Sequence, residues 1–150
     1  MRGLKIIVVL LVGGIFLTGC SNEKTLTCTN KEEQSGISMG QKVVMTFKND
    51  KVSYVKMSID NKATDSTIKD NWDMFASMMA EQFKEKEETG VSLTTKNNKE
   101  EHTFNVTLEI NLEKAKDDAL EEYGLDGIAN EKTTYEDTKK EIESKGFTCK

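Results

Sequence analysis

The chain has 150 residues, of which 36% are hydrophobic and 31% are charged. This composition is typical of one globular domain and excludes both a disordered polymer and a membrane protein with many spans. The net charge is -5, and two of the basic side chains, Arg2 and Lys5, precede Cys20, so the part of the chain from Cys20 onward has a net charge of -7. The phosphates of nucleic acid and anionic lipid head groups would repel such a chain, and we therefore expect neither as a partner.

The segment Met1–Gly19 has the organisation of a secretion signal. The basic residues Arg2 and Lys5 precede an apolar run, Ile6–Leu17. This run is too short to cross a bilayer as a helix, as is usual for a signal peptide. Leu17-Thr18-Gly19-Cys20 follows at once. This motif resembles a lipobox, the signature of bacterial lipoproteins.

The lipobox resemblance implies cleavage before Cys20 and a diacylglycerol thioether on its sulfur. We therefore expect residues 1–19 to be a signal peptide, 20–25 to be the lipidated cysteine with a short tether, and 26–150 to be one extracytoplasmic α+β domain. Membrane lipid would then be a partner through acylated Cys20, on the outer face of the plasma membrane in a Gram-positive cell or at the outer membrane in a Gram-negative one. An ordinary signal peptide or an uncleaved anchor helix is the alternative.

Cys28 and Cys149 remain once Cys20 carries lipid, and an even pair in an exported chain indicates a disulfide. Each alternates with an apolar neighbour, Leu26 or Phe147, as residues on one face of a strand do. We expect the first and last strands to lie side by side, joined by this disulfide. Metal binding is the rival interpretation. Two thiols and one histidine without local spacing make a poor zinc site, so we expect no metal.

Two apolar-rich runs, Gln41–Phe47 and Val52–Ile59, flank Lys48-Asn49-Asp50-Lys51 and predict a β-hairpin. A strict two-residue loop would split the apolar residues between the two faces. A three-residue loop, or a bulge near Ser53, would place most of them on one core face, and we favour that arrangement. The residues of this expected face are Val43, Met45, Phe47, Val55, Met57 and Ile59.

The pattern of residues 67–87 predicts a helix, with Thr67-x-x-Asp70 as a capping box at its start and Gly90 as the stop signal beyond its end. An apolar stripe at helical spacing runs along it, made of Ile68, Trp72, Phe75, Met79 and Phe83. Met74, Met78 and Met79 widen this stripe. A methionine-rich face is sometimes an adaptable binding surface, so Trp72, Met78 and Met79 are a candidate ligand or partner surface, although packing is the commoner role.

The second half of the chain predicts two strands, two helices and a closing strand. Residues 91–95 begin a strand, and a polar turn leads into the clearest strand, 104–112, in which every even position is apolar. This alternation is typical of an antiparallel sheet covered on one side. Helices are expected over 113–123 and over 135–145, the second opened by Thr133-x-x-Glu136, followed by a strand over 147–149. The order βββ-α-ββ-α-α-β predicts an α+β fold, with helices packed on one face of an antiparallel sheet.

Several short segments beside the lipobox carry a resemblance to known proteins: Phe47–Val52, Gln82–Lys84, Thr89–Val91, Ile110–Ala115 and Lys145–Phe147. With them, the mature chain resembles the YehR-like family of small bacterial lipoproteins. The resemblance implies a compact α+β domain and a lipid anchor, without an assigned biochemical role, and it does not imply the cysteine pair.

No sequence motif indicates catalysis. His102 is the single histidine, and it is in phase with the apolar positions of the long strand. No serine or cysteine stands at a spacing at which His102 would be expected to activate it as a nucleophile. A capping or edge role is the simpler interpretation. Asp117, Asp118, Glu121, Glu122 and Asp126 form an acidic group that lacks the alternating ligands of a calcium loop, and a solvated face explains it better.

We therefore expect a lipid-anchored extracytoplasmic lipoprotein with a non-catalytic binding or interaction role at the cell envelope. No enzyme activity and no cofactor is expected, and the partner would be a protein or a cell-wall component. The alternatives are a small-ligand carrier and an inhibitor of a cell-wall-attacking enzyme. An apolar cavity lined by Trp72 and the methionines would favour a carrier, whereas a flat exposed patch with aromatics would favour a protein partner.

Overall fold

A computed structural model describes residues 22–125 and 134–150, which form a seven-stranded antiparallel sheet with helices. The strand order across the sheet is β4-β5-β6-β3-β2-β1-β7. The strands are β1 (Glu23–Gln34), β2 (Ile37–Lys48), β3 (Lys51–Ala63), β4 (Lys86–Glu88), β5 (Val91–Asn98), β6 (Thr103–Asn111) and β7 (Thr148–Cys149). The helices are α1 (Ser66–Asp70), α2 (Trp72–Gln82), α3 (Asp117–Glu122) and α5 (Tyr135–Ser144).

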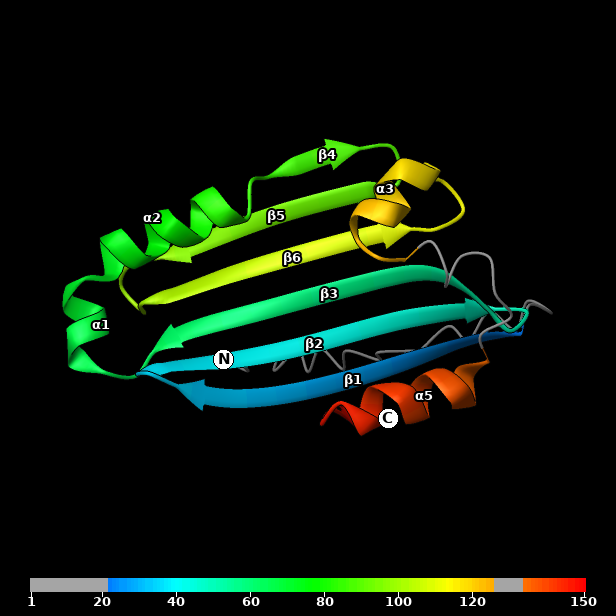
Figure 1. Cartoon of the computed structure of the whole chain (residues 1–150), viewed down its shortest axis with the longest axis horizontal. Coiled ribbons are helices and arrows are strands. Elements are labelled where there is room, and N and C mark those ends of the chain that lie inside the picture. Colours follow the sequence, from blue (N-terminus) through cyan, green and yellow to red (C-terminus); the bar gives the residue numbers. More distant parts are fainter. Residues whose placement is uncertain (1–21, 126–133) are drawn as a thin grey trace, which may run out of the picture.

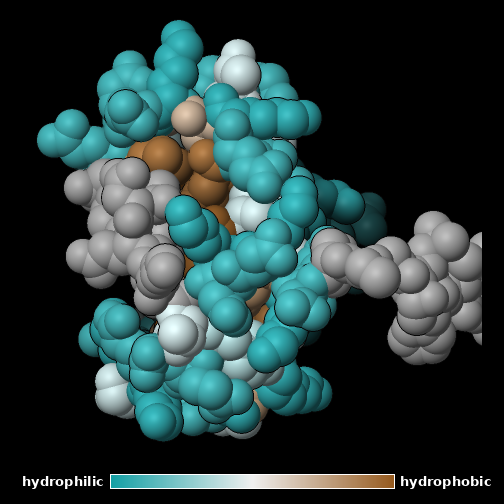
Figure 2. All heavy atoms as spheres, turned by 90° about the vertical axis from the view of Figure 1, so that its right-hand side faces the viewer, coloured by the Kyte–Doolittle hydropathy of each residue, from teal (hydrophilic) through white to brown (hydrophobic). Residues whose placement is uncertain are grey.

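The helices α2, α3 and α5 cover one face of the sheet (Figure 1). Each packs over its own cluster of core residues: α2 over one end of β6, α3 over the other end, and α5 over β1 and β2. The end of the molecule that carries α3 is mostly hydrophilic, and hydrophobic residues show there in a recess in its upper half (Figure 2). The expected α+β architecture with helices on one face is confirmed.

β6 shows why the core lies on that face. Its even positions, Phe104, Val106, Leu108 and Ile110, are buried, and the positions between them are only half-buried. Alternate residues of a strand point to opposite faces, so one face of the sheet meets the helices and the other meets solvent. The predicted alternation is confirmed.

The β2–β3 hairpin combines the two expected loop arrangements. Asn49 and Asp50 form a two-residue turn with φ of 53° and 59°, the left-handed values of the tight hairpin turn. The register then shifts because Phe47 pairs with Val52 whereas Thr46 pairs with Tyr54. Ser53 is therefore an extra residue. This bulge returns the apolar residues of β3 to the core face, and all six residues expected there pack in the core clusters.

Cys28 and Cys149 form the expected disulfide. They are direct register partners in the antiparallel pair β1–β7, with their Cα atoms 4.1 Å apart and their sulfurs bonded at 2.00 Å. Both are buried in the cluster under α5. Two backbone hydrogen bonds between Thr27 and Lys150 extend the pairing. The first and last strands thus lie side by side.

The single helix expected over 67–87 is wrong in three respects. It is broken at Asn71 into α1 and α2, and it ends at Gln82. Residues 86–88 instead form β4, which pairs with β5. The N-cap is Asp65, whose side chain accepts a hydrogen bond from the Thr67 N–H at 2.7 Å. The order among the described elements therefore has two helices where one was expected and an extra edge strand after them.

The two later helices are also shorter than predicted. α3 begins at Asp117 rather than at residue 113, because Lys114 and Ala115 donate backbone hydrogen bonds to Asn111 in a turn after β6. α5 is capped by Thr134, whose Oγ1 accepts from the Asp137 N–H at 3.2 Å. Thr133, which the sequence indicated as the opening residue, lies outside the described residues.

Candidate functional site

The residues of the predicted lipobox, Leu17, Thr18, Gly19 and Cys20, all lie outside the described residues. Within 22–125 and 134–150, none of the helices combines the length and the apolar content that spanning a membrane requires.

The structure separates the three residues of the candidate ligand surface. Trp72 is 3% exposed, and its Nε1–H donates to the Asn97 Oδ1 at 2.9 Å, so it belongs to the core. Met79 is half-buried and packs against the same cluster. Met78 is 56% exposed on the outer side of α2. Neighbours in a helix are about 100° apart, which explains why Met78 and Met79 do not share a surface.

An apolar groove lies on the helix-covered side of the sheet, between α2 and the strands β1, β2 and β3. Its volume is about 400 Å³, within the range of small-molecule sites. Exposed polar residues form part of its border: Glu32, Gln34, Ser35 and Gln82. The apolar lining consists of Ile37, Met39, Ile59, Phe75, Met79 and Phe83, all half-buried.

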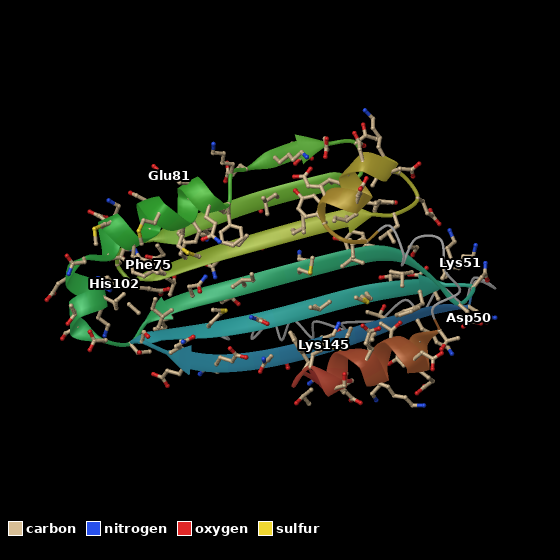
Figure 3. The ribbon with its side chains drawn as sticks, viewed as in Figure 1. Asp50, Lys51, Phe75, Glu81, His102 and Lys145 are labelled. Carbon is tan, nitrogen blue, oxygen red and sulfur yellow. A yellow bond between two sulfur atoms is a disulfide. The ribbon has the colours of Figure 1, made fainter. Side chains whose placement is uncertain are left out.

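The groove follows from the lengths of the elements. β2 and β3 have 12 and 13 residues, whereas α2 packs over β5 and β6 and α5 packs over β1 at the opposite end, so that β2 and β3 pass between them (Figure 1). Phe75 lies on the sheet side of α2, and Glu81 lies on its other side (Figure 3). Three of the five residues of the apolar stripe, Phe75, Met79 and Phe83, therefore form a wall of the groove.

Asn61 is the one buried amide in this groove. It is 3% exposed and lines the groove floor, and its Nδ2 donates to the Phe104 carbonyl at 3.4 Å. The sequence itself contains a signal for Asn61. β3 places Val55, Met57, Ile59, Asn61 and Ala63 on one face, and Asn61 is the single polar member.

His102 lies in a separate, polar depression of about 400 Å³ beside α1 and α2. Its ring stands edge-on to Trp72 at 5.9 Å, and its backbone carbonyl accepts from the Ala63 N–H. Asp70 and Asp73 also line this depression, and Asp73 pairs with Lys99 at 2.8 Å. No serine or threonine is among its described lining residues.

The face of the sheet without helices carries a small charged network. The Tyr54 Oη donates to one carboxylate oxygen of Glu109 at 2.7 Å, and the Lys56 Nζ approaches the other at 2.6 Å. Hydrogen bonding to Lys56, and then to Tyr54, holds the pKa of Glu109 below its usual value. Burial, reinforced by the Glu109 carboxylate, raises the pKa of Tyr54 to about 12. Both shifts favour the pair as it stands, a neutral phenol beside an ionised carboxylate.

The acidic residues of α3 face solvent, while Ala119 and Leu120 are buried. Glu122 and Glu88 both pair with Lys86, at 2.7 and 2.9 Å, and these bonds raise the pKa of the Lys86 ammonium. In the described part of the chain, no three metal-ligating side chains gather as a cation site would require. Asp126 lies outside the described residues.

Comparison with known proteins supports the fold. No protein-family model matches the chain, and no curated protein matches it. The chain is similar to an NMR structure of a protein from Streptococcus pneumoniae TIGR4, with a TM-score of 0.55 and 12% sequence identity, over 100% of this chain and 98% of that one. At this identity the likeness shows a shared fold and nothing beyond it.

Proposed function

We propose that the mature chain is a lipid-anchored extracytoplasmic binding module that holds its ligand in the apolar groove. Residues 1–19 would be the signal peptide, and Cys20 would carry the lipid. We also propose that the chain is a relative of the YehR-like lipoproteins. This relationship rests on the short motifs of the sequence.

The Cys28–Cys149 disulfide supports the extracytoplasmic location. Structural disulfides persist in oxidising compartments and are rare in the cytosol. This pair is buried and joins the two ends of the domain, as expected of a disulfide that stabilises the fold. It agrees with export by the signal at residues 1–19.

The groove is the observation that carries the binding role. Most core residues of a domain are covered by their neighbours, yet six large apolar side chains remain half-buried around one hollow. A concave apolar site with a few polar groups is the usual form of a small-ligand site. Its lining is apolar side chains and amides with a single carboxylate, Glu32, and a single hydroxyl, Ser35, which suits binding better than bond-breaking chemistry.

Anchoring is tested with Cys20→Ser in intact cells. We expect the variant to leave the membrane fraction and to enter the medium, because the sulfur that would carry the lipid is gone. Cys20→Ser protein that stays with the membrane would contradict the lipid anchor.

Binding is tested by photo-crosslinking in the anchored protein. Gln82 lies at the border of the groove, whereas its neighbour Glu81 lies on the other side of α2. We expect a benzoylphenylalanine at position 82 to capture an occupant in intact cells and the same group at position 81 to capture none. Equal capture at both positions, or none at position 82, would count against the groove as the binding site.

A further inference from the structure

The floor of the groove contains a polar atom that the fold itself does not use. The Asn61 side chain is almost fully buried, since 3% of the residue is exposed. Its Nδ2 donates to the Phe104 carbonyl on β6, and a carbonyl can only pair with the nitrogen end of the amide, which settles the orientation of the side chain. The Oδ1 is therefore turned away from β6.

Among the described residues, no group donates a hydrogen bond to the Asn61 Oδ1. Yet in the described part of the chain, no fully buried polar side-chain atom lacks a partner. The Oδ1 is consequently not sealed in the core and must be reached from the groove that Asn61 lines. A buried amide oxygen held open in an apolar site is costly unless something donates to it.

The charges around the groove restrict what that donor can be. Glu32, Met39 and Asn61 are successive register partners across β1, β2 and β3. They therefore form one row on the helix-covered face, and the backbones of Glu32 and Asn61 are two strand spacings, about 10 Å, apart. Glu32 is the one charged residue of the described lining, which includes no lysine or arginine.

Both polar features of this row accept hydrogen bonds, and one of them is negative. A carboxylate, a phosphate or a ketone has no hydrogen to donate to the Asn61 Oδ1, and the two anions would also be repelled by Glu32. A protonated amine offers three N–H donors and a positive charge. The negative charge of the mature chain, -7 from Cys20 onward, also raises the local concentration of cations.

We propose that the groove selects apolar amines: molecules with an aliphatic or aromatic body and a protonated nitrogen that donates to the Asn61 Oδ1. The body packs between Met39 and Ile59 on the sheet and Phe75 and Phe83 on the wall. Asn61 is the residue that sets specificity. This inference rests on the proposed function and names the class of ligand.

The test uses two probes with the same body and opposite head groups, 4-phenylbutylamine and 4-phenylbutyrate. They are titrated into the full chain bearing Cys20→Ser, with the disulfide formed, and the amide signals are followed by NMR. We expect the amine to shift signals of groove residues and to bind at least about tenfold more tightly than the carboxylate, a difference of about 1.4 kcal/mol. Equal affinities, or tighter binding of the carboxylate, would overturn the proposal.

A pair of variants assigns the selectivity to one residue. Asn61→Leu keeps the branched shape of the side chain and removes the acceptor, so we expect amine binding to weaken about tenfold while binding of the carboxylate changes less. Asn105→Leu makes the same change on the opposite face of the sheet and should leave both affinities unchanged. Amine affinity that survives Asn61→Leu would show that Asn61 does not select the ligand.

A third variant tests the role of the Glu32 carboxylate and changes no core residue. Glu32 is exposed, so Glu32→Gln should fold normally and reduce the preference for the amine probe. An unchanged preference would contradict the role given to the carboxylate. An occupant crosslinked at position 82, without any preference of the groove for the amine probe, would overturn this inference and leave the binding role standing.

Discussion

Reduction of the Cys28–Cys149 disulfide should remove a large part of the stability of the domain. The bond joins residues 121 positions apart. In the chain-entropy model, closing a loop of this length raises the free energy of the unfolded chain by about 5 kcal/mol at room temperature. The whole unfolding free energy of a typical domain is about 5–15 kcal/mol. Since β7 has only two residues, backbone pairing alone would hold the C-terminal strand weakly.

The effect can be measured by urea unfolding of the Cys20→Ser protein, followed by the fluorescence of Trp72, in the oxidised and reduced states. We expect the unfolding free energy to fall by about 4–5 kcal/mol on reduction. A Cys28→Ala/Cys149→Ala variant should be insensitive to the reductant, which controls for effects of the reductant itself. A loss below about 1 kcal/mol would refute the entropy argument, because a constraint on so long a loop could not then dominate.

Four further variants test the packing, the charged network and the turns. Phe47→Ala removes a side chain that is 1% exposed, and urea titrations should show a loss of about 3–5 kcal/mol; a near-neutral result would contradict its place in the core. Folding raises the pKa of Tyr54 from 10.0 to about 12. The neutral phenol therefore contributes its full share of the unfolding free energy below its unfolded pKa of 10.0, and this share is lost as the pH rises through the folded pKa of about 12. Tyr54→Phe should abolish this loss in stability measured against pH, and an unchanged profile would count against the raised pKa of Tyr54. Gly90 and Gly146 both have positive φ, +80° and +90°, which strains an alanine by about 1–2 kcal/mol. At Gly90 alone a Cβ would also overlap the backbone of the turn before α3, so Gly90→Ala should unfold at lower urea concentration than Gly146→Ala, and the reverse order would refute this.

The sheet could be predicted because its signals are local and periodic. β6 alternates over its whole length, and the Asn49–Asp50 turn has residues that accept left-handed backbone angles. The bulge at Ser53 follows from the requirement that the apolar residues of β3 share one face. The two cysteines could be paired because the sequence assigned Cys20 to the predicted lipobox and each of the other two occupied a strand-like pattern.

The helix ends could not be predicted from the same signals. The segment Lys84–Glu88 is rich in lysine and glutamate, which favour helix, yet part of it forms β4 because Glu88 pairs with Val91 across the turn at Gly90. Tertiary pairing overrides local propensity there. The break at Asn71 has a weaker local signal, since its side chain donates to the Thr67 carbonyl at 2.8 Å and competes with helix continuation.

The groove lay beyond sequence reasoning because it is built by three distant segments. Ile37 and Met39 come from β2, Ile59 and Asn61 from β3, and the wall from α2. The sequence indicated that the stripe of α2 was apolar but not that a part of it would stay uncovered. The one indication of the groove in the sequence was Asn61, a polar residue at an otherwise apolar position of the strand pattern.

The direction of β1 sets how far the groove lies from the point where the described chain begins. The chain enters β1 beside the Asn49 turn, where the Asn49 N–H donates to the Asn22 carbonyl, and it leaves β1 at Glu32 and Gln34, which border the groove. The strand that joins these ends has 12 residues, a length of about 40 Å. With a lipid at Cys20, the groove would project outward from the membrane, and its occupant would arrive from the surrounding medium and the wall rather than from within the bilayer.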